Sequence, residues 1–528
     1  MSNQEIAAQL KLIGQLLELK GENKFKVRSY LNAAFQLGRH PEPVAEQHVD
    51  QLAQIKGIGR NLAPKVAEIA RHGTCKYLDE LLADVPPGVV QMLAIKGLGP
   101  AKVKQIWENL GIESPGELLY ACYENRLKDA KGFGEKTQNQ VRKAIEFMIE
   151  NSGKALYAKI EPHLKPLLEE VISRPEVDDA AWVGEVARYS PVITTAELLV
   201  SSKEAIDVGQ FELPVALVVH TCKPDEFPRK RFILSSSENH LLSLKIKEDE
   251  DIDNCYRSRG FNYIPIEMRE GHREFEWARQ YTQGELITES HLKGCLHNHS
   301  TYSDGLDSLQ AMAVAAREMG FEYFGICDHS ISASYAGGLN ENEITEQHLE
   351  IDRLNEALQP FRILKGIESD IRTDGSLDYP EEVLATFDFV VASVHSALKM
   401  DKQRATERLV RAIENPHTKI LGHPTGRLLL SRPGYPLNMD MIIDACSSNG
   451  VALELNANPM RLDIDWRYVY QCMEKNVLIS INPDAHNIAG LTHMRYGVMA
   501  ARKGGLIQKY CLNALSLEQL LHYWNISG

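Results

Sequence analysis

Histidines and carboxylates recur at the ends of apolar runs in the C-terminal half of the chain. His297 and His299 are separated by one residue, and Asp304 follows them in a polar stretch. On a strand both imidazoles would face the same side, where two histidines can hold one metal ion. A single pair of this kind also arises by chance, so the later residues carry the argument.

Five further apolar runs end in side chains of the same kind, namely His329, Glu368, His395, His423, and Asp484 with His486. One buried histidine at a strand end is usually a satisfied core residue. Six such segments in series are hard to explain as core, because clustered imidazoles and carboxylates need cations to neutralise them. Strand-like and helical stretches alternate from residue 294 onward, which predicts a (β/α) barrel with its chemistry at the strand C-termini.

Residues 291–528 resemble the PHP phosphoesterase domain at these positions and at the stretches 423–428 and 494–498. The resemblance implies that nine residues hold up to three divalent metal ions: His297, His299, Asp304, His329, Glu368, His395, His423, Asp484 and His486. We expect the catalytic residues to be Glu368, as a carboxylate bridging two metals, with Asp484, His486 and Arg427. Lys399 and Arg495 are further candidates for phosphate contacts, and Asp328 is expected to support a ligand. Six imidazoles with three carboxylates favour Mn²⁺, Zn²⁺ or Fe²⁺ over Mg²⁺.

Length and composition describe an ordinary globular protein of several domains. The chain has 528 residues, 44% of them hydrophobic and 25% charged, which is too long for one core. Its nine cysteines form no Cys-x-x-Cys motif, so we expect reduced thiols. We see no apolar run of about 18 residues and no signal-peptide pattern, and we expect a cytoplasmic monomer with no membrane partner.

Charge is unevenly distributed, with a net of +2 in residues 1–150 and −16 in the remainder. The N-terminal part is therefore the better candidate for phosphate backbones. It has helical apolar spacing throughout and repeats one pattern at 55–59, 95–99 and 130–134. A Gly-apolar-Gly turn lets backbone N–H groups approach a phosphate. These repeats could be plain turns, but they resemble helix-hairpin-helix motifs, implying DNA contacts at Gly57, Gly59, Lys65, Gly97, Gly99, Lys102, Gly132 and Gly134.

The stretch 22–30 resembles the N-terminal domain of the family X DNA polymerases. That resemblance implies that Lys65 could form a Schiff base with a deoxyribose, although a phosphate contact or a surface lysine is the commoner role. The family's palm needs a Gly-Ser turn and paired aspartates for two Mg²⁺ ions, but the matching positions here hold Glu185, Thr195 and Glu197. One carboxylate cannot hold two such ions. We therefore expect a degenerate polymerase site in a retained scaffold.

Together these features predict a multidomain α and α/β protein. We expect an all-α helix-hairpin-helix domain at 1–150, a reduced nucleotidyltransferase-like palm and thumb at 151–290, and a distorted PHP barrel at 291–528. The predicted function is DNA repair on nicked, gapped or abasic duplexes, by 3′–5′ exonuclease action, with abasic-site endonuclease or 3′-phosphatase activity left open. The alternatives are an active polymerase with a proofreading barrel, a non-catalytic DNA-binding scaffold and a small-molecule phosphatase.

Overall fold

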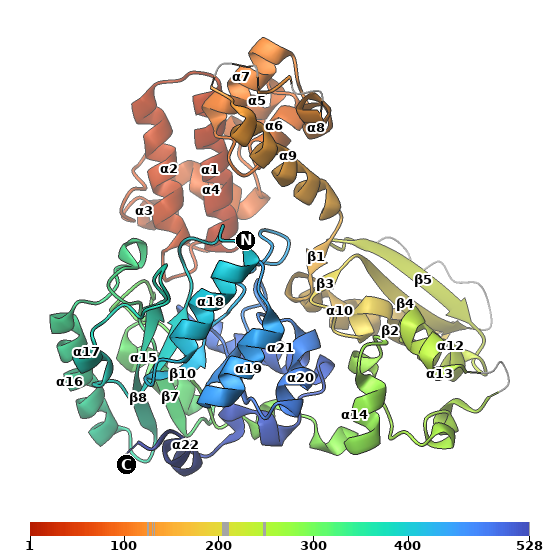
Figure 1. The fold of residues 1–528 in the computed structure, drawn as a ribbon. Helices are drawn as coiled ribbons and strands as arrows, with labels where there is room; N and C mark the ends of the chain where they lie inside the picture. The colour runs from red at the N-terminus through yellow and green to blue at the C-terminus, as the bar shows by residue number, and fades with distance from the viewer. Residues whose placement is uncertain (124–125, 129, 131, 203–210, 247–249, 527–528) are drawn as a thin grey trace. The chain divides into compact units, whose positions relative to one another are not determined.

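The computed structural model describes residues 1–123, 126–128, 130, 132–202, 211–246 and 250–526 (Figure 1). The chain forms two compact units, Met1–Ser152 and Gly153–Gly528. No helix in these described ranges is both long and apolar enough to cross a bilayer.

The first unit is helical, as the apolar spacing predicts. Helix α1 begins after Ser2, whose hydroxyl accepts from the Glu5 N–H, and it buries Ile6, Leu10, Ile13 and Leu17 on one face. Its helices are α1 (Asn3–Leu19), α2 (Lys24–Gly38), α3 (Val49–Leu52), α4 (Ala63–His72), α5 (Lys76–Ala83), α6 (Pro87–Met92), α7 (Pro100–Leu110), α8 (Pro115–Tyr123) and α9 (Glu135–Glu150).

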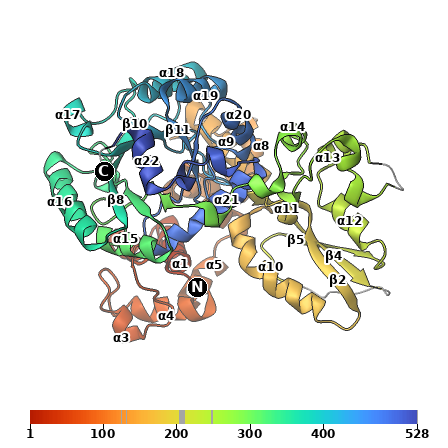
Figure 2. The same ribbon diagram turned by 90° about the horizontal axis from the view of Figure 1, so that it is seen from below.

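The second unit begins with a small α/β layer. Strands β2 (Val177–Val183), β4 (Thr195–Ser202) and β5 (Ala216–Cys222) form a sheet in the order β2-β4-β5, with β2 and β4 antiparallel and β4 and β5 parallel. Helix α10 lies along this sheet (Figure 2) and packs its apolar face on it. The layer also contains α10 (Tyr157–Ile172), α11 (Gly184–Ala187), and a strand pair of β1 (Ala155–Leu156) with β3 (Val192–Ile193).

Helices α12 (Phe227–Leu234), α13 (Glu238–Leu244) and α14 (Glu274–Gln280) follow the sheet. Several of their buried side chains, including Phe232 and Trp277, belong to the same hydrophobic core as the barrel. The core is therefore continuous across residue 290, where we predicted a domain boundary.

The rest of the second unit is a nearly closed barrel of parallel strands, as predicted. Its strands neighbour one another in chain order: β6 (Gly294–Cys295), β7 (Tyr323–Ile326), β8 (Arg362–Asp370), β9 (Phe389–Ser393), β10 (Thr418–Leu421), β11 (Ala452–Asn456) and β12 (Ile479–Asn482). The chain beyond β6 meets the chain beyond β12, because the His299 N–H donates to the Ala485 carbonyl (2.8 Å) and the Asp484 N–H to the His297 carbonyl (3.1 Å). This closure brings the two ends of the strand series to one mouth.

Helices cover the barrel strands, which is why the strands read as continuous apolar runs. The helices are α15 (Leu309–Glu318), α16 (Glu341–Ala357), α17 (Glu381–Leu384), α18 (Lys402–Ile413), α19 (Met439–Asn449), α20 (Val469–Glu474), α21 (Met494–Lys503) and α22 (Leu517–Trp524). Trp524 of α22 stacks on Phe389 at the start of β9, with ring centroids 5.2 Å apart. This apolar packing fills the end where the strands begin and leaves polar chemistry to the opposite end.

Candidate metal centre

The nine predicted metal ligands converge at the C-terminal ends of the barrel strands. Each follows its strand or ends it, so the parallel arrangement alone brings them together. Among the described residues, the side chains able to share a metal ion form four overlapping groups, with ligand atoms within 4.8 Å of one another. The groups are His299 with Asp304, His329 and His486; His297 with His299 and Asp484; His297 with Glu368 and His423; and His329 with Glu368 and His395.

Glu368 lies at the middle of the cluster and is 1% exposed. Its two oxygens face five imidazoles, with Oε1 at 3.3 Å from His297 Nε2, 3.3 Å from His395 Nε2 and 3.0 Å from His423 Nε2, and Oε2 at 3.0 Å from His329 Nδ1 and 3.7 Å from His299 Nε2. A carboxylate with ring nitrogens on both of its oxygens has the arrangement of a bridging ligand.

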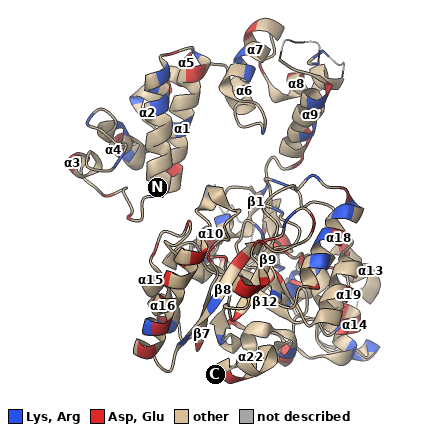
Figure 3. Cartoon of the chain, turned by 60° about the vertical axis from the view of Figure 1, so that its left-hand side comes forward, with Lys and Arg blue, Asp and Glu red and all other residues tan. Residues whose placement is uncertain are grey.

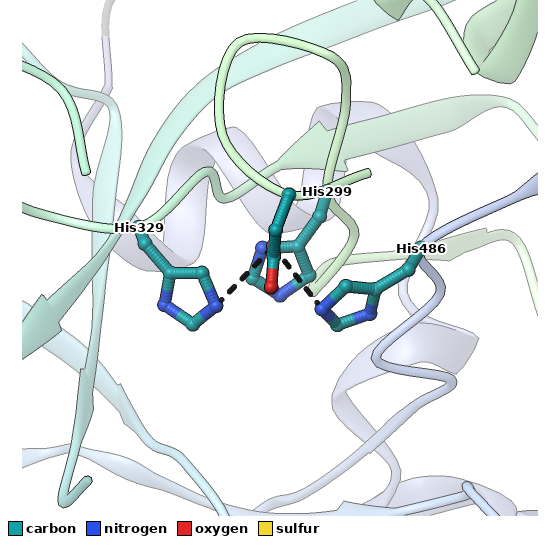
Figure 4. A group of neighbouring side chains, drawn as sticks. His299, His329 and His486 are labelled. Atoms are coloured by element: carbon teal, nitrogen blue, oxygen red, sulfur yellow. Dashed lines mark ion pairs between the residues drawn. The ribbon is translucent and has the colours of Figure 1, made fainter. Parts of the chain in front are cut away.

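The outer side of the cluster is built on Asp304 and His486. Asp304 Oδ1 lies 3.5 Å from His329 Nε2 and 3.3 Å from His486 Nε2, and the ring of His486 stacks on that of His299 with centroids 4.2 Å apart. Figure 4 shows the rings of His299, His329 and His486 turned toward a common space. His486 is the most exposed of the nine side chains, at 37%, so solvent reaches the centre from this side.

The buried atoms of the centre fit divalent metal ions. In the described part of the chain His297 Nε2, His299 Nδ1, Asp304 Oδ1 and both carboxylate oxygens of Glu368 are buried without a hydrogen-bond partner, which is costly unless cations satisfy them. Burial and the neighbouring His486 and His329 lower the pKa of His299 to about 3. Its ring is therefore neutral at pH 7 and keeps a lone pair for a metal.

Two carboxylates that the sequence analysis did not select orient these ligands. Glu454, in the middle of β11, is fully buried, and its Oε1 lies 2.7 Å from His297 Nδ1. Its Oε2 accepts from the His423 N–H at 2.7 Å. Asp370, two residues beyond Glu368 on β8, lies 2.5 Å from His395 Nδ1. Contacts of this kind fix the ring orientation of metal-bound histidines. For Glu454 the sequence did hold a signal of this role, because it is a charged residue inside the otherwise apolar run 452–455.

The positions matching the polymerase site hold side chains engaged elsewhere. Glu197 Oε2 lies 2.8 Å from His220 Nε2. Glu185 Oε2 accepts from the N–H and the hydroxyl of Thr194 at 2.6 and 2.8 Å. None of the metal-competent groups found in the described ranges lies in this sheet.

The three Gly-apolar-Gly turns of the first unit share one conformation. Gly57, Gly97 and Gly132 have positive φ values of 86°, 95° and 86°, while the residues after them, Ile58, Leu98 and Phe133, are buried. The second glycines Gly59, Gly99 and Gly134 have open space where a Cβ would be, and Gly99 and Gly134 cap α7 and α9. Packing does not require glycine there, so these turns offer bare backbone to a ligand. Lys131 lies outside the described residues.

Lysines flank these turns, and in Figure 3 the ribbons of α2, α7 and α9 carry the blue that marks Lys and Arg positions. Lys102 lies over the ring of Phe133 at 5.7 Å. Lys65 Nζ donates to the Asn61 carbonyl at 3.2 Å, and it shares the ring of Tyr77 with Lys26, each ammonium 5.4 Å from the centroid.

Comparison with known proteins agrees with this architecture. Residues 1–75 match the family model of a helix-hairpin-helix domain, 89–146 that of a SAM-like helix-hairpin-helix tandem, and 295–458 that of the PHP domain. A protein of Bacillus subtilis called DNA polymerase/3′-5′ exonuclease PolX is 33% identical, in an alignment covering 98% of this chain and 99% of the relative. The chain belongs to the PolX family.

Other relatives of this PolX-family chain match a smaller share of it. A probable phosphatase of Acetivibrio thermocellus is 30% identical over 36% of this chain and 78% of its own length. The structure of a putative histidinol phosphatase from Listeria monocytogenes aligns with a TM-score of 0.32 and 14% identity over 38% of this chain and 97% of that one. The family resemblances drawn from the motifs, to family X polymerases and to PHP domains, are confirmed.

The cations of the PolX-family barrel do not all lie where we expected. Arg427 donates to Asp465 (2.7 Å) and to the carbonyls of Arg461 (2.9 Å) and Leu462. It therefore holds the segment 461–465, and within the described part of the chain it makes no hydrogen bond or ion pair with the nine ligands. Arg461 Nε, by contrast, lies 3.4 Å from Asp484 Oδ2. The sequence analysis missed Arg461 because nothing in its neighbourhood marks it.

Of the two other predicted phosphate contacts Arg495 is paired with a glutamate, and the expected supporting residue has a clear role. Arg495 donates to Glu161 at 2.8 Å and so joins α21 to α10, and Lys399 is exposed. Asp328 accepts from the N–H and hydroxyl of Ser300 at 2.8 and 2.7 Å. It thereby fixes the loop that presents Asp304.

Proposed function

We propose that this PolX-family chain is a DNA repair enzyme whose PHP barrel hydrolyses phosphodiesters, acting as a 3′–5′ exonuclease. The observation that carries the proposal is the convergence of nine predicted ligands, several with unpartnered buried atoms, at one barrel mouth. The chemistry of the donors favours Mn²⁺ or Zn²⁺. The name of the Bacillus subtilis relative includes the same activity.

The nine residues would hold the metal ions in the overlapping groups described above, with Glu368 between groups. When bound, such ions activate water at neutral pH and stabilise the phosphate charge. Glu454 and Asp370 orient His297, His423 and His395 through their other nitrogens.

A DNA phosphate would enter beside Asp304 and His486, the more exposed members of the cluster. Arg461, next to Asp484, is in our proposal the guanidinium that orients it, in place of Arg427.

In this proposal the helix-hairpin-helix unit binds the DNA. Open backbone at Gly59, Gly99 and Gly134 and the lysines beside it suit phosphate contacts that do not depend on sequence. We propose nicked, gapped or abasic duplexes as substrates. A lyase role for Lys65, the abasic-site and 3′-phosphatase activities, a monomeric state and a cytoplasmic location all stay predictions.

The test is digestion of a 3′-labelled nicked duplex by the full chain and its variants. H297A/H299A removes two ligands that share one face and should reduce hydrolysis by at least about a thousandfold, with bound metal lost in elemental analysis. The matched control D388N changes a half-buried carboxylate at the opposite end of β9, where it accepts from the Lys365 N–H at 2.8 Å. Full activity in H297A/H299A would refute the proposed centre. A wild-type protein that retains no metal and cleaves nothing would favour a DNA-binding scaffold.

A templated polymerase is the second candidate, since the relative's name includes that activity. We propose that this chain lacks it, because Glu197 is paired with His220 and Glu185 with Thr194. We expect no nucleotide incorporation on a primed template with Mg²⁺ or Mn²⁺. Incorporation that E197A abolishes would overturn this view.

A further inference from the structure

A cavity of about 550 Å³ lies in the second unit apart from the metal centre. The segment before α14, the loop after β10 and the residues beyond β11 form its walls, and none of the nine predicted ligands lines it. The lining residues that matter are Arg273, Arg427, Tyr435, Met439, Asp465 and Arg467. The volume falls within the range of small-ligand sites, about 300–1,000 Å³.

Positive charge dominates the cavity wall, although residues 151–528 carry a net charge of −16. Asp465 is the one carboxylate among its lining residues, and it pairs with both Arg427 (2.7 Å) and Arg467 (2.9 Å). Arg273 is held separately by Glu474 through two contacts of 2.7 Å. One guanidinium charge therefore remains without its own carboxylate.

Arg467 is the cation best placed to meet a ligand. Its side chain is 56% exposed, and among the described residues only its Nη1 is hydrogen-bonded, to Asp465. The remaining nitrogens present the planar donor geometry that matches a phosphate.

Part of the cavity wall is apolar. Tyr435, Leu437 and Met439 line it. Tyr435 is 7% exposed, and its hydroxyl is buried without a hydrogen-bond partner in the described ranges. The hydroxyl therefore lies beneath the wall, and this part of the cavity offers a ligand apolar side chains that include one aromatic ring.

We propose that this cavity binds a nucleoside monophosphate group, with the phosphate on Arg467 and the base against Tyr435 and Met439. The site is separate from the metal centre and needs no metal. The group could be a free nucleotide or one residue of a DNA strand. The proposal does not depend on the barrel's hydrolytic activity.

The experiment is titration calorimetry of the full chain with dAMP after dialysis against EDTA. We expect saturable binding to the wild type and equal binding to H297A/H299A. R467Q should weaken binding at least about tenfold, as expected for loss of a charged hydrogen bond, and R467K should weaken it less. Y435L should weaken binding several-fold, because the aromatic ring against the base is lost. Unchanged melting temperatures would show that the variants fold.

Two further titrants identify the source of the group. Tighter binding of a thymidine pentanucleotide than of dAMP, with the same dependence on Arg467, would indicate a strand, and weaker binding a free nucleotide. Absence of dAMP binding, or binding indifferent to both R467Q and Y435L, would overturn the proposal. So would loss of binding in H297A/H299A, which would put the nucleotide at the metal centre. Inorganic phosphate binding as tightly as dAMP would refute the base contact.

Discussion

Replacing Glu454 by glutamine tests whether the proposed metal centre depends on the carboxylate behind it. Both oxygens of Glu454 accept hydrogen bonds, Oε1 from Asn482 Nδ2 (3.0 Å) and Oε2 from the His423 N–H (2.7 Å), while Oε1 also lies 2.7 Å from His297 Nδ1. A glutamine of the same shape has one amide nitrogen, so in either orientation an N–H group would face a donor. The site is fully buried, and no water can relieve the mismatch.

The expected loss follows from two effects. An unsatisfied buried donor costs about 1–3 kcal/mol, and removal of the charge makes His297 a weaker ligand. Substitutions of such outer carboxylates reduce metal affinity or activity about 10–100-fold, which corresponds to about 1.4–2.7 kcal/mol. We therefore expect E454Q to fold, to retain less metal and to hydrolyse DNA 10–100-fold more slowly, by the same reasoning.

The assay combines elemental analysis of dialysed protein with digestion of the nicked duplex over a series of Mn²⁺ concentrations. Excess Mn²⁺ should restore part of the E454Q activity, because the primary ligands remain. D388N serves as the matched control, since it makes the same chemical change at the far end of the barrel. Metal content and rate within about twofold of the wild type would refute the role of Glu454.

Two further predictions concern DNA binding by the helix-hairpin-helix unit and the stability of the protein in acid. G99D/G134D should keep the melting temperature of the wild type, because aspartate is a good N-cap and a Cβ meets open space there, yet it should bind duplex DNA at least about tenfold more weakly through repulsion of phosphate. The G99S/G134S control separates the effect of charge from that of side-chain bulk. Equal binding by all three proteins in a gel-shift titration would contradict the hairpin contact. Burial lowers the pKa of His240 below 6.5 despite its contact with Glu274. The stability that this neutral ring contributes is therefore present above pH 6.5 and is lost as the pH falls through the lowered pKa. Calorimetry of chelator-treated protein should show the melting temperature of the wild type falling more steeply in acid than that of H240Q, and parallel curves would contradict the assignment.

Much of the proposed site could be read from spacing. His297 and His299 share a face because side chains alternate along an extended chain, and the later ligands follow apolar runs that only a buried parallel strand explains. Since the strands of such a barrel all point one way, their ends must meet at one mouth. The hairpin turns were equally predictable from the sequence, because the positive φ values at Gly57, Gly97 and Gly132 favour glycine.

Other features depend on contacts between residues far apart in the chain. Arg427 and Arg461 look alike in sequence, and only the folded loop sends one to Asp465 and the other to Asp484. The partner of His297 is Glu454, 157 residues away, which no local periodicity encodes. The core likewise runs on across residue 290, because packing follows surface complementarity between segments.

The sequence alone thus determined the residue types, the strand and helix periods and the end of the barrel at which the ligands gather. Tertiary structure decided which charged side chains meet and where a cavity lined by arginines remains. Periodicity constrains each helix or strand by itself, whereas the pairing of side chains far apart in the chain depends on loop conformations and on the closure of the barrel.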